Sequence, residues 1–329
     1  MKTILDIQKL SVSFRTDDGL LQAVNNISFT LNQGEVLGIV GESGSGKTVT
    51  GMSIMRLLQQ SEGSSIKGKI VFEGTDLLKL SEKNMQNIRG NKIAMIFQDP
   101  MTSLNPFLRV STQIMEVLVR HKHMSKRKAH QEAVRLLKMV SIPQPERRVD
   151  NYPHQFSGGM RQRIVIAMAI SCKPHILIAD EPTTALDVTI QAQVLDIIKE
   201  LKDKINTAVI LITHDLGVVA GLCDRVHVMY AGRMMEKGTV HQIFSDPKHP
   251  YTQGLLHSLP RIDQNKDELL SSIPGQAPNL ITLSGGCPFF PRCTERMDIC
   301  LNTYPGSRAP SQNREVQCWK YEKQETNNV

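Results

Sequence analysis

The residues best placed to do chemistry form a glycine-rich loop near the N-terminus. Residues 41–48 match the pattern G-x-x-x-x-G-K-[ST] in full, between an apolar run and a segment with helical spacing. Glycines in such a loop turn backbone N–H groups toward phosphates, and the helix N-terminus adds a favourable dipole. We expect Lys47 to reach the β- and γ-phosphates of a nucleotide and the Thr48 hydroxyl to bind Mg²⁺. The predicted nucleotide-binding residues of this loop are Gly41, Ser43, Gly44, Ser45, Gly46, Lys47 and Thr48.

A pair of acids follows a second apolar run. Asp180 and Glu181 come directly after residues 176–179, at the carboxyl end of a predicted strand, where α/β sheets bind ligands. Asp180 is expected to hold Mg²⁺ through water, and Glu181 to polarise an attacking water. An Asp-Glu pair alone is more often a solvated strand end. The phosphate loop upstream favours the catalytic interpretation.

The elements that must position these groups alternate between strands and helices. Short apolar runs predict buried parallel strands at residues 36–40, 176–179 and 208–212. Helical spacing predicts a helix that Ser125 caps, and another over about residues 189–204. This alternation predicts an α/β domain with a parallel sheet.

Length and composition limit the classes of function. The chain has 329 residues, 40% of them hydrophobic and 22% charged, which argues against wholesale disorder. No apolar run approaches the ~18 residues that span a bilayer, and an acid, Asp6, interrupts any signal-type start. The net charge of +7 suits phosphate ligands or an anionic membrane surface without identifying either.

Further motifs resemble those of ABC (ATP-binding cassette) ATPases. Residues 156–163 resemble the family's signature sequence, residues 97–100 its Q-loop and residues 185–187 its D-loop. Residues 213–215 resemble the segment with the switch histidine, and Phe14 resembles the aromatic residue that stacks on adenine. All of these motifs occur in the family order.

The resemblance implies a P-loop NTPase fold, with a RecA-like core and a helical subdomain. It implies an ATP-binding cassette over residues 1–259, with the helical subdomain at about 100–172. From about residue 260 Pro and Gly become frequent and helical periodicity is lost, so residues 260–329 are expected to form a C-terminal extension.

The resemblance also assigns roles to residues outside the phosphate loop. Glu181, His214 and Gln98 would be catalytic, with Gln98 also a ligand of Mg²⁺. The signature residues Ser157, Gly158 and Gly159, together with Asp187, would bind nucleotide, the signature meeting the γ-phosphate held by an opposing subunit. From the residues alone, Ser-Gly-Gly is a common helix cap and a lone histidine at a strand end is usually structural.

Within the family, the chain resembles the ATP-binding subunit of dipeptide/oligopeptide importers. The resemblance rests on residues 95–106, 152–156 and 249–252 and covers nearly the whole chain. It implies an ATPase on the cytoplasmic face of the cell membrane, working with two membrane-spanning permease subunits. A second, different ABC ATPase subunit and an extracytoplasmic peptide-binding protein complete the implied complex, which involves no nucleic acid.

Several alternatives stay open at this point. Related ATP-binding subunits move nickel or metallophore complexes, so the resemblance does not decide the substrate of this chain. A soluble non-transport ABC ATPase is disfavoured because the chain has one cassette and no sustained heptads. A nucleic-acid-binding protein is suggested only by scattered basic residues of the extension, without an aromatic stacking platform. Those residues are Arg292, Arg296, Arg308 and Arg314.

An apolar segment follows the Q-loop motif. Its large residues are Met101, Leu104, Phe107 and Leu108. They form either a surface that receives a short helix of a membrane subunit or the packed root of the helical subdomain.

Four of the six cysteines fall in the extension. Cys287, Cys293, Cys300 and Cys318 are spaced C-x5-C-x6-C-x17-C, whereas Cys172 and Cys223 have apolar surroundings typical of packing residues. A cytosolic setting disfavours disulfides, and structural zinc usually shows tighter C-x2-4-C pairs. A 4Fe-4S cluster needs four thiolates but tolerates varied spacing, and free thiols remain possible. Similar tails occur in peptide-importer ATPases, and this resemblance implies a 4Fe-4S cluster.

Overall fold

A computed structural model of the protein describes residues 2–58, 63–184, 187–258, 273–283 and 285–322. The chain forms two compact units, each assembled from segments that are distant in the sequence. The first unit consists of Met1–Leu5, Thr30–Val36 and Val71–Ile212. The second consists of Asp6–Phe29, Leu37–Ile70 and Thr213–Val329.

Three parallel strands form the centre of the first unit. They are β6 (Ile93–Ile96), β7 (Ile176–Asp180) and β8 (Ala208–Thr213), in the order β8-β7-β6. Every residue of the three strands is buried, as in a parallel sheet covered on both faces. The strands expected at 176–179 and 208–212 are confirmed, and with them the α/β class. A two-residue strand, β5 (Thr75–Asp76), pairs with the end of β4.

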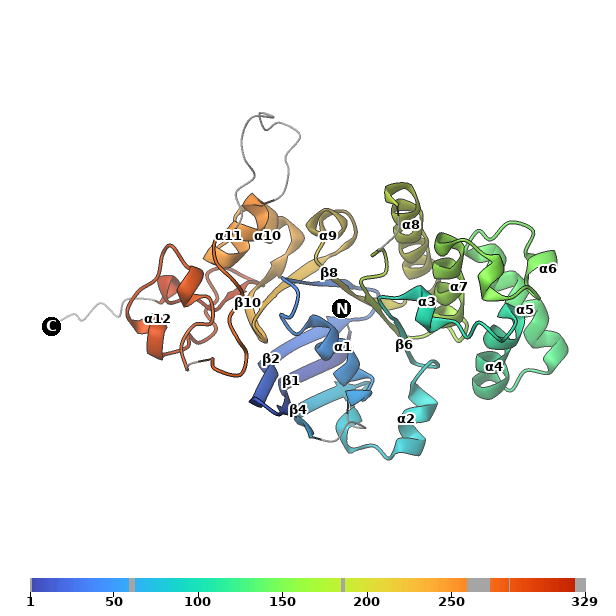
Figure 1. Ribbon diagram of the computed structural model, residues 1–329, viewed down its shortest axis with the longest axis horizontal. Helices are drawn as coiled ribbons and strands as arrows, with labels where there is room; N and C mark the ends of the chain where they lie inside the picture. Colours follow the sequence, from blue (N-terminus) through green and yellow to red (C-terminus); the bar gives the residue numbers. More distant parts are fainter. Residues whose placement is uncertain (1, 59–62, 185–186, 259–272, 284, 323–329) are drawn as a thin grey trace. The chain divides into compact units, whose positions relative to one another are not determined.

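The first unit also contains several helices. They are α2 (Glu82–Ile88), α3 (Pro100–Ser103), α4 (Val110–Lys122), α5 (Lys126–Met139), α6 (Pro145–Arg148), α7 (Gly158–Ile170) and α8 (Val188–Ile205). Helices α4, α5 and α7 pack against one another (Figure 1). The capped helix expected after Ser125 is confirmed, because the Ser125 hydroxyl accepts the Lys128 N–H at 3.5 Å.

The second unit contains most of one antiparallel sheet and a further set of strands. Strands β1 (Thr3–Thr16), β2 (Gly19–Asn32) and β4 (Ser64–Phe72), most of whose residues belong here, have the order β2-β1-β4. The further set has the order β11-β10-β9-β3, with β3 and β9 parallel. Its members are β3 (Val36–Val40), β9 (Arg225–Tyr230), β10 (Arg233–Thr239) and β11 (Glu315–Val316).

Short helices complete the second unit. They are α1 (Lys47–Ile54), α9 (Leu216–Leu222), α10 (Val240–Ser245), α11 (Pro250–His257) and α12 (Ile299–Asn302). The helix after the phosphate loop, α1, is short. It ends at Ile54, because the next turn is broken by Arg56, whose φ of 51° is left-handed.

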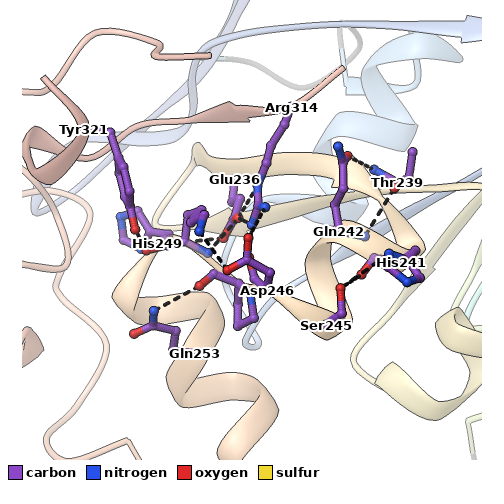
Figure 2. Close-up of polar contacts among 12 residues, drawn as sticks. Glu236, Thr239, His241, Gln242, Ser245, Asp246, His249, Gln253, Arg314 and Tyr321 are labelled. Carbon is purple, nitrogen blue, oxygen red and sulfur yellow. Dashed lines mark hydrogen bonds and ion pairs between the residues drawn. The ribbon is translucent and has the colours of Figure 1, made fainter. Parts of the chain in front are cut away.

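The C-terminal extension is anchored to the second unit by a buried ion pair. Arg314 and Glu236 are only 3% and 1% exposed, and Arg314 Nη2 donates to Glu236 Oε1 at 2.7 Å. The same carboxylate accepts the backbone N–H groups of Lys248 and His249, both at 2.9 Å (Figure 2). Removing Arg314 would take away the guanidinium that pairs with the buried Glu236 carboxylate, which is costly for a buried charge. Strand β11 adds to this anchor by pairing with β10.

Part of the expected organisation concerns residues outside the described ranges. The boundary near residue 260 falls within the undescribed residues 259–272, so the division into a cassette and an extension stays a prediction. Residues 322–329 are polar, which predicts a frayed end, and all but the first lie outside the described ranges. Among the described residues, no helix combines the length and apolar character needed to cross a membrane.

Candidate functional site

The phosphate loop, residues 41–48, turns sharply between β3 and α1. Gly41 and Gly46 have φ of 153° and 99°, in the region that favours glycine. A Cβ atom at Gly41 would lie 2.0 Å from the Met229 carbonyl oxygen, and one at Gly46 would lie 2.4 Å from the Ala23 oxygen. Since both neighbours are backbone atoms, a side chain at either position would displace the loop or the strands behind it.

The ammonium group of Lys47 is held inside this loop. Lys47 is 5% exposed, and its Nζ donates to the backbone oxygens of Gly41 at 2.8 Å and Glu42 at 2.9 Å. Thr48 follows in the first turn of α1 and is half-buried, Ser45 is buried, and Ser43 is exposed. The loop therefore forms as the sequence predicts, while its phosphate and Mg²⁺ contacts stay predictions.

Two other predicted residues belong to the same unit. Phe14 lies on β1 and is half-buried. His214 is exposed and comes directly after the last residue of β8. The next residue, Asp215, caps α9 by accepting the Gly217 N–H at 2.8 Å, which fixes the turn that carries the histidine.

In the first unit, Glu181 occupies a strained turn. Asp180, the last residue of β7, is 2% exposed. Glu181 follows with a φ of 46°, which is uncommon for a residue with a side chain and costs of order 1–3 kcal/mol. Its N–H donates to the Ile212 oxygen at 2.8 Å. Gln98 Nε2 donates to Glu181 Oε2 at 3.0 Å, so the structure brings these two predicted residues together.

Two further residues support this turn and were not singled out from the sequence. The Thr184 hydroxyl donates to Glu181 Oε2 at 2.9 Å. Gln162, which is buried on α7, donates through Nε2 to the Pro182 oxygen at 2.7 Å. Gln162 lies inside the signature motif, where it looks like a spacer residue, and only the packing of α7 beside the turn reveals its contact. Thr184 lies between the recognised motifs.

The signature segment opens α7 as a capped helix. The Ser157 hydroxyl accepts the Met160 N–H at 3.4 Å. A Cβ atom at Gly159 would lie 2.6 Å from Ile190 Cγ2, so packing against α8 requires glycine there. A Cβ atom at Gly158 would meet nothing within 4 Å. The helix-cap interpretation of Ser157 is therefore correct, and open space beside Gly158 is compatible with the predicted phosphate contact.

Asp187 has a comparable capping position. Its Oδ1 accepts the Ile190 N–H at 2.9 Å at the start of α8. The other D-loop residues, 185 and 186, lie outside the described residues. A nucleotide contact by Asp187 stays a prediction.

The four cysteines of the extension line one cavity. Cys287, Cys293, Cys300 and Cys318 face a space of about 20 Å³, and Cys287 N–H donates to the Cys300 oxygen at 2.8 Å. Burial raises the pKa of Cys287 to about 12 and that of Cys318 to about 11, so both are neutral thiols near pH 7. Across the described ranges, no group of three or more His, Cys, Asp or Glu side chains is arranged to hold a metal ion. The described residues therefore show no preformed metal centre, and the iron–sulfur site stays a prediction.

The remaining cysteines differ in their burial. Cys172 is buried, as expected of a packing residue, whereas Cys223 is half-buried. A Cβ atom at Gly38 would lie 3.0 Å from Cys223 Sγ, so this thiol packs against β3.

Comparisons with known proteins agree with these observations. Residues 24–184 match the family "ABC transporter", and residues 235–300 match "Oligopeptide/dipeptide transporter, C-terminal region". The chain is 56% identical over 319 residues to the dipeptide transport ATP-binding protein DppD of Bacillus subtilis (strain 168), covering 97% of this chain and 95% of that protein. It is 54% identical to the oligopeptide transport ATP-binding protein OppD of Salmonella typhimurium, covering 96% and 93%.

A solved structure is similar as well. It is the dimeric post-hydrolysis state of the ATP-binding cassette MJ0796 bound to ADP and Pi. The TM-score is 0.65 at 25% identity, over 72% of this chain and 99% of that chain.

Replacing Thr184 tests whether the hydrogen bond that its hydroxyl donates to the Glu181 carboxylate contributes to catalysis. Thr184→Val removes a donor to the Glu181 carboxylate and leaves the donor on Gln98 in place. A hydrogen bond to a charged group contributes about 1.5–3 kcal/mol, so we expect kcat for ATP hydrolysis to fall about tenfold or more. The KM for ATP should stay within twofold. Thr184→Ser, which keeps the donor, is the matched control, and a Thr184→Val enzyme with wild-type kcat would contradict the prediction.

Proposed function

The chain belongs to the ATP-binding subunits of ABC transporters and is an ATPase, and from this premise we propose that it energises the uptake of dipeptides or oligopeptides. The observation that carries the proposal is similarity along almost the whole chain to ATP-binding proteins of dipeptide and oligopeptide transport. The match to the oligopeptide/dipeptide C-terminal region adds weight, because this part lies outside the match to the general ABC transporter family.

In the proposed reaction, water attacks the γ-phosphate of ATP in line with the departing ADP. Lys47 and the backbone N–H groups of the phosphate loop hold the phosphates, and Phe14 stacks on adenine. Mg²⁺, held by Thr48, Gln98 and Asp180, would neutralise charge that develops on the phosphates.

The residues around Glu181 then prepare the water. The Glu181 carboxylate polarises it, and the donors on Gln98 and Thr184 fix that carboxylate in place. His214, at the end of β8, contacts the γ-phosphate and orients the water. This division of roles is supported by the contact between Gln98 and Glu181 and by the strain at Glu181, since strained backbone gathers at functional sites.

The proposed complex follows from the same family. Two such ATPase subunits would face each other, with Ser157, Gly158, Gly159 and Asp187 of one completing the nucleotide site of the other. The exposed, capped start of α7 supports this arrangement, because its N-terminus presents Ser157 and Gly158 to solvent. We place the chain on the cytoplasmic face of the cell membrane, with two permease subunits, a second ATPase subunit and an extracytoplasmic peptide-binding protein.

Phe107 is the residue best suited to contact a permease subunit. Its side chain is 86% exposed, whereas Leu104 is buried at 2%. The packing and docking interpretations therefore each apply to part of the segment. Leu104 packs the root of the helical region, whereas Phe107 and the neighbouring Leu108 offer an exposed apolar surface.

The catalytic role of Glu181 is tested by Glu181→Gln in the complete transporter. The amide cannot act as a base, so we expect ATP hydrolysis to fall by about 10²-fold or more, while ATP binding is retained. Steady-state phosphate release and nucleotide binding are the two measurements. Near-wild-type turnover in the variant, with all subunits present, would overturn the assignment.

Docking through Phe107 is tested by Phe107→Asp. A charge at the centre of an apolar contact should prevent association, so the variant should no longer co-purify with the membrane subunits. Leu20→Asp is a matched control, because Leu20 is also an exposed apolar residue, at 60%. Retained co-purification of Phe107→Asp would exclude this surface as the docking site.

We also propose that Cys287, Cys293, Cys300 and Cys318 hold a 4Fe-4S cluster. Their convergence on one cavity supports this assignment, as does the donor set of four thiols. The cavity has room for about one water molecule, so the cysteine side chains would have to move apart to admit a cluster. When bound, the cluster would cross-link the extension.

Anaerobic purification tests the cluster. The wild-type chain should be brown, absorb in the blue and contain iron, and Cys300→Ser should lose both colour and iron. Cys172→Ser is the control, because Cys172 is buried in the other unit. Colourless wild-type protein, or protein that contains zinc instead, would refute the assignment.

A further inference from the structure

The phosphate loop is tied to the C-terminal extension through one residue, Glu42. The Glu42 carboxylate receives a hydrogen bond from Arg292 Nη1 at 2.8 Å, and the Arg292 side chain is only 7% exposed. The Glu42 N–H donates to the Tyr251 hydroxyl at 2.9 Å. Burial raises the pKa of Tyr251, so this hydroxyl stays protonated and neutral.

The third polar group of Glu42 reaches the residue that is expected to hold the phosphates. The Glu42 carbonyl oxygen accepts from Lys47 Nζ at 2.9 Å and from Ser45 N at 3.2 Å. Arg292, Glu42 and Lys47 therefore form a continuous chain of charge-assisted contacts that runs from the extension into the loop. Such contacts are about twice as strong as hydrogen bonds between neutral groups.

Arg292 is itself fixed from several sides. Its Nη1 also donates to the Tyr230 hydroxyl at 3.2 Å, and Nε and Nη2 donate to the backbone oxygens of Pro274 and Ile273 at 2.9 and 3.1 Å. The rings of Tyr230, Tyr251 and Phe289 pack together beside it, with centroids 4.6 to 5.4 Å apart. The guanidinium is thus pre-organised before any ligand binds.

We infer that Arg292 is a positioning residue for nucleotide binding: the extension presents it to Glu42, and this ion pair sets the conformation of the phosphate loop and the location of Lys47. The inference rests on the proposed function, because it takes the loop to be the ATP site. Arg292 itself does not touch the nucleotide. It acts only through Glu42.

The test compares the ATP affinity of the full-length chain with that of Arg292→Gln and Glu42→Gln. Loss of a contact to a charged group should raise the Kd for ATP about tenfold in each variant. Because both changes remove the same ion pair, the double variant should bind ATP about as weakly as either single variant. Arg292→Lys, which keeps the charge but not the fork, should recover part of the affinity.

Two measurements distinguish a positioning role of Arg292 from a general effect on the stability of the chain. In the complete transporter, Arg292→Gln should raise the KM for ATP with kcat within about twofold of wild type, since only binding is weakened. Arg296→Gln is the matched control, because Arg296 is an exposed arginine of the same extension that lies over the Phe290 ring, 5.7 Å from its centroid. Its Kd should equal that of wild type.

Each possible result supports or contradicts the proposed role of Arg292. An Arg292→Gln chain that binds ATP like wild type overturns it, as do additive losses in the double variant. If Arg292→Gln fails to fold, Glu42→Gln still tests the ion pair from the loop side, and unchanged affinity there overturns the inference. A wild-type chain that binds no ATP would contradict the proposed function itself, which is a distinguishable result.

Discussion

The proposed phosphate site is a tight backbone turn that the surrounding residues hold in place. The phosphate loop passes through left-handed conformations at Gly41 and Gly46, pressed against the backbone of neighbouring strands. Glu42 fixes the turn because its N–H, its carbonyl oxygen and its carboxylate are each engaged. Two of the partners, Tyr251 and Arg292, come from late in the chain.

The turn at Glu181, in the other unit, is likewise held by the residues around it. Glu181 has a positive φ that its own side chain disfavours, and the turn is held by neighbours from several segments of the chain. Ile212 of β8 accepts its N–H, Gln98 and Thr184 hold its carboxylate, and Gln162 of α7 holds the next peptide group. Strain of this kind persists only where the surroundings over-determine the conformation.

Much of this architecture could be predicted from the sequence, because it is encoded locally. Apolar runs predicted β3, β7 and β8, and Ser125 predicted the start of α5. The phosphate loop and the acids after β7 are short motifs with a fixed spacing. The supporting contacts could not be predicted, because they join distant positions: Arg292 and Glu42 are 250 residues apart, and Tyr251 and Glu42 are 209 apart.

The basic residues of the extension have contacts that composition does not reveal. Arg292 and Arg314 are scattered in the sequence of a Pro- and Gly-rich tail, yet the side chain of each is buried in an ion pair. A buried arginine has no sequence signature of its own, since its partner acid lies elsewhere in the chain. These pairs connect the extension to other segments of the second unit.

The central claim is that the extension holds the phosphate loop in shape, and amide hydrogen exchange measures this most directly. We predict that Arg292→Gln speeds exchange in peptides covering residues 41–48, because the carboxylate anchor of Glu42 is lost. Peptides covering β7 in the first unit serve as the internal reference and should exchange as in wild type. Exchange in the phosphate loop that is unchanged by Arg292→Gln would contradict the claim.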